Sequence, residues 1–208
     1  MLFWVAVAGV AVMASVAMWA MIRLFGLAVA APVETRPIVR ATMENWASSE
    51  IGRLGFEPLG LILFPAMKKD AELIERTALR APTADTVAAT GETARGLPGV
   101  VFLSAWPDGS YVITRCPQPR FFGTRRTAKA LAGFGATATE AWAQHRGALR
   151  EFGLSRGRPL TVETLEEAVA CYRAAAPTFR RAMLRTVLLV LPLGLAAWAL
   201  LAWANFAR

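Results

Sequence analysis

The stretch GVVFLSAWPDGSYVITRC, residues 99–116, decides the fold that we expect for the middle of this chain. Two runs rich in β-branched and aromatic residues flank the tripeptide Pro107-Asp108-Gly109. Proline presets φ at the start of a tight turn and glycine accepts a positive φ, so such a tripeptide joins neighbouring antiparallel strands. The sequence therefore predicts a β-hairpin within a small antiparallel sheet, with Asp108 serving the turn.

Segments on either side of this hairpin contain further elements. FEPLGLILF, residues 56–64, predicts a strand whose proline and glycine indicate an edge or a bulge. RFFGTRR, residues 120–126, predicts a third strand after the hairpin. Residues 66–81 favour a helix, and residues 81–99, which are small, polar and broken by Gly and Pro, favour a mobile loop.

Two helices are expected to pack against this sheet. Residues 137–153 place Thr137 and Glu140 at the spacing of a capping box, ahead of an apolar stripe. Residues 161–176 begin with Thr161 as a candidate N-cap and carry glutamates in the first turn, where the helix dipole stabilises them. A small sheet packed by helices is an α+β fold.

Both ends of the chain are long and apolar. The 208 residues are 55% hydrophobic with a mean hydropathy of +0.41, and residues 1–22 and 186–207 contain no charged residue. About 20 apolar residues suffice to cross about 30 Å of hydrocarbon. The sequence therefore predicts two transmembrane helices, one at each terminus. A cleavable signal peptide is disfavoured, because no Lys or Arg precedes the first apolar run and that run is too long.

The basic residues predict how the chain is oriented. Residues 33–185 hold 21 of the 23 Lys and Arg and all 15 acidic residues, a net charge of +6. Arginines follow the first span and precede the second, and such positions stay on the cytoplasmic side of a membrane. We therefore expect both termini outside. The expected parts are an N-terminal transmembrane helix with its exit segment (1–32), a cytoplasmic α+β domain (33–180) and a C-terminal transmembrane helix (181–208).

Small residues recur along the first span at every third position. Such a face lets helix backbones approach closely in lipid, so it can pack against the second span or against another subunit. The alternative is that the spacing reflects the alanine-rich composition of the whole chain, and both interpretations stay open. Neither span contains an ionisable residue, so no proton relay or ion pathway is predicted. The residues of this face are Ala8, Ala11, Ala14, Ala17 and Ala20.

Catalytic patterns are weak in this sequence. His145 is the only histidine and shares a helical stripe with Trp142 and Leu149, which favours a packing role and leaves it as a minor functional candidate. GLSRG, residues 153–157, matches the serine-nucleophile pattern G-x-S-x-G. That mechanism needs the serine on a turn from a strand to a helix, with the histidine later in the sequence. Here the motif follows a helix and His145 precedes it, so we interpret the match as chance. The two cysteines, expected to be reduced thiols, have no metal-ligand spacing. We therefore predict no catalytic, metal or cofactor site and no identifiable small-molecule substrate.

Basic residues after the hairpin form the densest charge patch of the sequence. Together with the arginines before the second span, they suit anionic lipid headgroups or an acidic partner protein. The alternative is a plain solvated face, and nucleic acid is not expected because no recognition motif is present. These residues are Arg115, Arg120, Arg125, Arg126, Lys129, Arg180 and Arg181.

Three motifs occur in a fixed order: LGFEPLG, then VFLS and PDGSYVIT, then EAWAQHRGALREFG. In this order they resemble uncharacterised bacterial membrane-anchored proteins, over residues 54–153. The resemblance implies a small α+β domain on a membrane anchor, and it carries over no activity. We expect the chain in a bacterial inner membrane, either the plasma membrane or an intracytoplasmic one.

These features together predict a non-catalytic accessory or scaffolding subunit of a larger membrane complex, in contact with lipids and with other subunits. Respiratory and photosynthetic assemblies are candidate hosts. One alternative is a membrane-tethered enzyme or ligand sensor that uses His145 or Asp108. Another is a protein that binds anionic lipid through the basic patch, with nucleic acid ranked below lipid.

Overall fold

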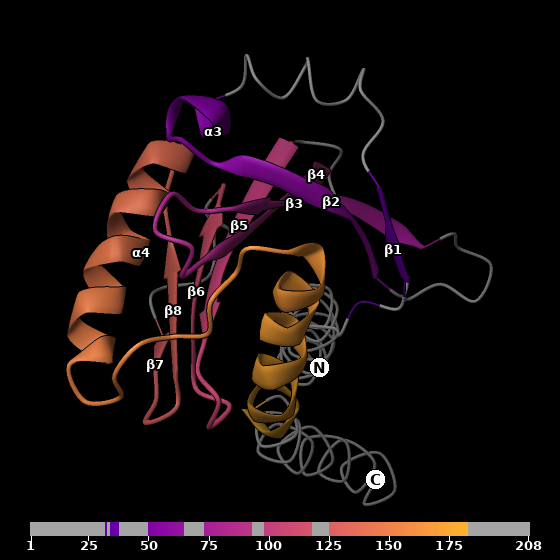
Figure 1. Ribbon diagram of the computed structural model, residues 1–208. Coiled ribbons are helices and arrows are strands. Elements are labelled where there is room, and N and C mark those ends of the chain that lie inside the picture. The colour runs from indigo at the N-terminus through magenta and orange to yellow at the C-terminus, as the bar shows by residue number, and fades with distance from the viewer. Residues whose placement is uncertain are drawn as a thin grey trace, which may run out of the picture. The chain divides into compact units, whose positions relative to one another are not determined.

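The computed structural model describes residues 32, 34–37, 50–64, 73–92, 98–117 and 125–182. The chain divides into two units, and the unit Val29–Thr178 contains almost all of the described residues. In this unit the described residues form one eight-stranded sheet with helices against it (Figure 1). The predicted α+β class is therefore confirmed.

From β1 to β6, strands that are consecutive in the sequence are also neighbours in the sheet. The full order is β1-β2-β3-β4-β5-β6-β8-β7. Neighbours pair antiparallel except β6 and β8, which are parallel. The expectation of a small antiparallel sheet is therefore wrong in size and in one pairing, because β8 folds back from β7 and lies between β7 and β6. The strands are β1 (Glu34–Arg36), β2 (Glu57–Phe64), β3 (Ile74–Arg80), β4 (Val87–Glu92), β5 (Pro98–Ala105), β6 (Tyr111–Cys116), β7 (Arg125–Arg126) and β8 (Ala130–Phe134).

The central hairpin forms as the sequence predicts. Strands β5 and β6 pair from Val100 opposite Cys116 to Ala105 opposite Tyr111. In the turn Gly109 has a φ of +78°, which glycine adopts without a steric penalty. The strand predicted at residues 56–64 is β2, and its register shifts between the proline and the glycine that indicated a bulge.

Two segments fold differently from the sequence expectation. Strand β3 lies within the segment that favours a helix, and its Ala78 and Leu79 are fully buried. Strand β4 lies within the predicted loop, and its Ala88 and Ala89 are fully buried. Pairing and burial in the middle of a sheet outweigh local propensity at both places. Of the strand predicted at 120–126, only β7 and its two residues are described.

Helix α4 (Ala138–Gly153) covers one face of the sheet. Thr137 Oγ1 accepts a hydrogen bond from Glu140 N at 3.1 Å, and the Glu140 carboxylate accepts one from Ala136 N at 3.0 Å, so the predicted cap is present. Helix α3 (Glu50–Arg53) adds Ile51 to the core beneath α4. The buried residues of this core are Ile51, Phe56, Leu79, Ala81, Ala88, Val100, Phe102, Ala138, Ala141 and Trp142.

A second helix, residues 165–182, covers the opposite face with its part up to Thr178 (Figure 1). Leu165 packs over Gly60, and Tyr172 meets Phe64 edge-on with ring centroids 5.2 Å apart. Its N-cap is Thr164, whose Oγ1 accepts from Glu167 N at 3.2 Å. The expected cap at Thr161 is therefore displaced by three residues along the chain.

No helix among the described residues is long and apolar enough to cross a membrane. The two predicted spans, residues 1–22 and 186–207, and the alanine face of the first span lie outside the described residues.

Candidate functional site

His145 lies fully buried on α4, in a chain of hydroxyl groups that runs through the core. Its Nε2 lies 3.1 Å from Ser104 Oγ, and its Nδ1 lies 3.1 Å from Thr114 Oγ1. Ser104 Oγ in turn lies 2.8 Å from Thr86 Oγ1, which donates to Asp85 Oδ1 at 3.0 Å. The ring therefore ties α4 to the neighbouring strands β5 and β6.

The surroundings of His145 are those of a packed and hydrogen-bonded core residue. Burial lowers the pKa of His145 to about 3, so the ring is neutral at pH 7. A neutral imidazole has one donor and one acceptor, and the Ser104 and Thr114 hydroxyls engage both nitrogens. The packing interpretation accounts for these contacts. The enzyme or sensor alternative expects His145 to be partly exposed in a cleft, and the structure does not place it there.

The GLSRG motif is the turn that ends α4. Gly157 N donates to Gly153 O at 3.0 Å, and Gly157 has a φ of +77°. Ser155 Oγ donates to Phe152 O at 3.4 Å and accepts from Arg156 Nη1 at 3.1 Å. A nucleophilic serine needs a strained turn between a strand and a helix, so this motif is structural.

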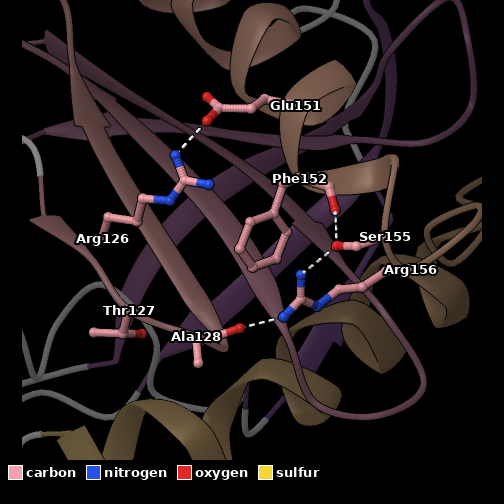
Figure 2. A pocket seen from close by; sticks show the side chains of 7 residues that line it. All are labelled: Arg126, Thr127, Ala128, Glu151, Phe152, Ser155 and Arg156. Carbon is pink, nitrogen blue, oxygen red and sulfur yellow. Dashed lines mark hydrogen bonds and ion pairs between the residues drawn. The ribbon is translucent and has the colours of Figure 1, made fainter.

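A pocket of about 310 Å³ lies between this turn and the hairpin of β7 and β8 (Figure 2). The hairpin supplies one wall, and the end of α4 with the following turn supplies the other. The lining is mostly polar and contains two arginines. The lining residues are Arg126, Thr127, Ala128, Glu151, Phe152, Ser155 and Arg156.

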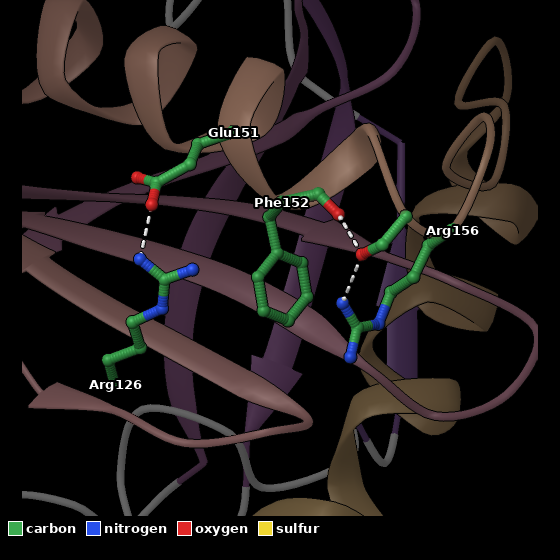
Figure 3. Close-up of polar contacts among 5 residues, drawn as sticks. Arg126, Glu151, Phe152 and Arg156 are labelled. Atoms are coloured by element: carbon green, nitrogen blue, oxygen red, sulfur yellow. Dashed lines mark hydrogen bonds and ion pairs between the residues drawn. The ribbon is translucent and has the colours of Figure 1, made fainter.

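The two arginines lie on either side of the Phe152 ring (Figure 3). The guanidinium carbon of Arg156 lies 4.1 Å from the ring centroid, a cation–π contact. Arg126 Nη1 forms an ion pair with Glu151 Oε1. Phe152 itself is buried edge-on against Trp106, with centroids 5.3 Å apart, so the ring between the two cations is held in place.

Hydrogen bonds fix the Arg156 guanidinium from three directions. Its Nη2 donates to Ala128 O, its Nε to Ser110 Oγ at 3.2 Å, and its Nη1 to Ser155 Oγ at 3.1 Å. A guanidinium has five N–H groups, so these bonds leave two of them for a further acceptor. Arg156 is therefore a positioned cation with donor capacity at the pocket.

The charges on the pocket wall do not balance. Arg126 and Arg156 are positive and Glu151 is negative, so one positive charge is in surplus. The Arg126 and Glu151 side chains are 60% and 56% exposed, and a solvated pair of this kind contributes about 1 kcal/mol at most. A carboxylate or phosphate from outside can therefore replace Glu151 on Arg126 at small cost.

The turn of the central hairpin contacts the pocket through Ser110, which accepts a hydrogen bond from Arg156. Ser110 Oγ donates to Asp108 Oδ2 at 2.7 Å, and Ser110 N donates to Asp108 Oδ1 at 2.9 Å. These bonds, the hydroxyl first, hold the pKa of Asp108 below its usual value. Lys129 Nζ donates to Asp108 O at 3.3 Å, so it joins this turn to the hairpin of β7 and β8.

The predicted basic patch is divided in the structure. Arg126 lines the pocket and Lys129 lies beside it, whereas Arg115 lies on β6 and points to the face that the second helix covers. Arg125 is described only by its backbone in β7, and Arg120 lies outside the described residues. Arg180 and Arg181 are exposed and belong to the other unit of the chain.

The sequence analysis did not single out Arg156. Its guanidinium nevertheless donates three of the hydrogen bonds described above. The available signal was its place between the end of a helix and a glycine that takes positive φ. The G-x-S-x-G pattern directs attention to Ser155. The side chain of this turn that bonds to the central hairpin and to the hairpin of β7 and β8 is that of Arg156, the next residue.

Comparison of the chain with protein-family models, with curated proteins and with solved structures finds no match. Among the described residues, no group of three or more His, Cys, Asp or Glu could hold a metal ion. Cys116 is half-buried and Cys171 is buried, and both are free thiols. What the pocket binds is therefore argued from its own geometry.

Proposed function

We propose that this protein is a non-catalytic accessory subunit of a larger membrane assembly, and that its central domain holds an acidic segment of a partner subunit. The observation that carries the proposal is the pocket with Arg126 and Arg156 on either side of Phe152 and one positive charge in surplus. Two cations around an aromatic ring suit a carboxylate side chain with apolar neighbours.

Glu151 acts as the internal competitor of this partner. It occupies one edge of the Arg126 guanidinium while the domain is free, and a partner carboxylate takes its place. Because both partners of the present ion pair are more than half exposed, the exchange costs little desolvation. The Arg156 guanidinium needs no rearrangement, since its three bonds to the protein already fix it.

The membrane anchoring is part of the same proposal. The apolar residues 1–22 and 186–207 form two spans, both termini lie outside, and the domain lies in the cytoplasm next to the membrane. Two anchors keep the domain attached to the bilayer. The high effective concentration that results lets a weak pocket hold a neighbouring subunit.

Purification from native membranes in mild detergent tests this function. The full chain should bring the same partner subunit with it, and Arg126→Glu should reduce its recovery at least about tenfold, because like charge replaces the pairing. Glu151→Gln should raise the recovery, because it removes the competitor. Arg150→Glu is the matched control, since Arg150 is exposed on α4 but is not among the residues that line the pocket.

Two results would contradict the proposal. One is a chain that is recovered alone under conditions that preserve membrane complexes. The other is equal loss of the partner with Arg126→Glu and Arg150→Glu, which would indicate a general charge effect. Loss of binding to anionic vesicles in place of loss of a partner would assign the pocket to lipid.

A further inference from the structure

Leu154, in the turn after α4, is the most exposed large apolar side chain among the described residues. It is 90% exposed, whereas Phe152, two residues earlier, is buried in the core. The backbone of this turn is fixed, because Arg156 N and Gly157 N both donate to Gly153 O, at 3.1 and 3.0 Å. The turn therefore presents the leucine side chain to the outside, where its apolar surface is available to a contact beyond the domain.

The turn that carries Leu154 lies at the same end of the domain as two hairpin turns (Figure 1). Arg156 joins it to both, since its Nη2 donates to Ala128 O and its Nε donates to Ser110 Oγ. Trp106 Nε1 donates to Gly157 O at 3.1 Å, a further bond between this turn and the central hairpin. The three loops therefore form one continuous surface, here called the tip surface, which consists of residues 107–110, 127–129 and 154–158.

The helix at residues 165–182 leaves the domain beside the tip surface. A Cβ at Gly109 would lie 3.2 Å from Thr178 Oγ1 and 3.3 Å from Ala174 O, so the turn of the central hairpin touches the last part of this helix within its unit. Residues 186–207, the predicted second span, begin eight residues after Thr178, about 12 Å along a helix. With these residues in the membrane, as proposed, the tip surface is the end of the domain from which the chain enters it.

Exposed cations accompany the leucine on the tip surface. Lys129 and Arg158 are both exposed. The acidic side chains of Glu151 and Asp108, at the same end, are bonded to Arg126 and Ser110. An apolar side chain among Lys and Arg residues is typical of a segment that lies at a membrane interface, because the apolar group enters the acyl boundary and the cations meet lipid phosphates. The charge of the tip surface therefore complements an anionic bilayer.

We propose that the tip surface docks on an anionic lipid surface, with Leu154 in the boundary between headgroups and acyl chains and with Lys129 and Arg158 on lipid phosphates. This inference rests on the proposed membrane anchoring, and it goes further because it states which end of the domain faces the bilayer. The three side chains that it uses do not line the acidic-partner pocket. A partner segment in that pocket then lies close to the lipid headgroups.

The full chain, reconstituted in lipid nanodiscs without partner subunits, tests this docking. Leu154→Cys carries a polarity-sensitive fluorophore, in a chain with Cys116→Ser and with the fully buried Cys171 left in place. Because Leu154 is almost fully exposed, its replacement does not disturb the core. Ala143→Cys is the matched control, since Ala143 is exposed on the same face of α4 three turns earlier, about 16 Å along the helix.

In discs that contain phosphatidylglycerol, the emission of the probe at residue 154 should shift to the blue, and a lipid with a quencher near its headgroup should quench it. The probe at residue 143 should keep the emission that it has in water. Arg158→Glu changes the charge by two, so it should lower the equilibrium constant for docking, read from the extent of quenching, by about 30-fold. Arg53→Glu is the charge control, since Arg53 is exposed on α3, which is bonded to the opposite end of α4 through Glu50 and Thr139.

Four results would overturn the proposal: equal quenching of the probes at residues 154 and 143, equal quenching at residue 154 in discs of phosphatidylcholine alone, equal losses with Arg158→Glu and Arg53→Glu, and a blue shift without quenching by lipid. The last result would assign the tip surface to another protein chain. A chain that does not enter the discs would overturn the membrane anchoring as well. The acidic-partner function is tested by partner recovery with Arg126→Glu, so its failure leaves the docking on lipid standing.

Discussion

At the scale of single residues, His145 shows how a polar side chain can organise an apolar core. Its two ring nitrogens bond to Ser104 and Thr114, and its ring stacks on Trp142 with centroids 5.8 Å apart. A buried polar network of this kind is stabilising only while all of its members are paired. His145 therefore positions α4 on the sheet through two directional hydrogen bonds as well as through apolar ring contact.

Replacement of His145 should be costly. His145→Ala leaves a cavity and two buried hydroxyls without their partner, so the free energy of unfolding should fall by about 3 kcal/mol. Chemical denaturation of the full chain in detergent, followed by tryptophan fluorescence, measures this change. Gln144→Ala, at an exposed position next to His145, is the control and should change it by less than about 0.5 kcal/mol. Equal effects of the two substitutions would contradict the interpretation.

His145 also predicts a pH dependence. In the unfolded chain it takes up a proton near pH 6.5, whereas burial in the folded chain lowers its pKa to about 3. Between these values the unfolded state binds more protons, so the free energy of unfolding should decrease as the pH falls, by about 2 kcal/mol at pH 5. Denaturation midpoints at pH 7 and pH 5 measure the effect. His145→Gln should remove this part of the decrease, and an unchanged decrease would refute the assignment.

The sequence predicted the residues of the pocket only in part. Arg126, which lines the pocket, and Lys129, which lies beside it, stand out as charges in a basic segment. Arg156 does not, because its role depends on Ala128 and Ser110, which approach it only after the sheet has formed. Chain neighbours cannot reveal an acceptor that comes from another element.

At the scale of elements, the junction between β8 and α4 leaves no room for a side chain at Gly135. Gly135 N donates to Arg115 O at 2.9 Å, and the first turns of α4 pass directly over Gly135. A Cβ at Gly135 would lie 2.4 Å from Ala141 N and 2.6 Å from Ala141 Cα. Only a residue without a side chain lets the helix approach this closely.

Gly135→Ala should therefore push α4 away from the sheet and lower the free energy of unfolding by about 2–3 kcal/mol. Gly147→Ala offers a matched control, because nothing lies within 4 Å of a Cβ at this helical position. That substitution should stabilise the protein by about 0.5–1 kcal/mol, since alanine is the better helix former. Parallel denaturation curves of the two variants check both signs. If Gly147→Ala also destabilised the protein, the difference that we expect between the two glycine positions would be refuted.

The elements that the sequence predicts correctly are those with complete local signals. The hairpin has its turn tripeptide, and α4 has its cap and its apolar stripe. Strands β3 and β4 lack such signals, because residues such as Ala88 and Ala89 are neutral in isolation and become strand residues through pairing on both sides. The parallel pair of β6 and β8 is equally hidden, since it depends on where the hairpin of β7 and β8 folds back.

At the scale of the whole molecule, the orientation in the membrane stays a prediction that the arginines near both spans support. Alkaline phosphatase, which is active only outside the cytoplasm, should be active when fused after residue 208. It should be inactive when fused after residue 178, before the second span. A fluorescent protein that folds only in the cytoplasm should give the opposite pattern. Activity of the phosphatase at residue 178 alone would indicate the inverted orientation.

The two edges of the sheet have a consequence for chains that are crowded together. The edge strand β1 has three exposed residues, with Arg36 Nε 2.8 Å from Glu34 Oε1, and the other edge strand, β7, consists of two arginines. An open sheet with long apolar edges recruits strands from its neighbours and aggregates, whereas short charged edges repel them. Under the proposed membrane anchoring, the domains of neighbouring chains lie in one plane and meet at high local density. Their charged borders should keep them individually folded, and lengthening β1 with apolar residues should produce amyloid-like clusters.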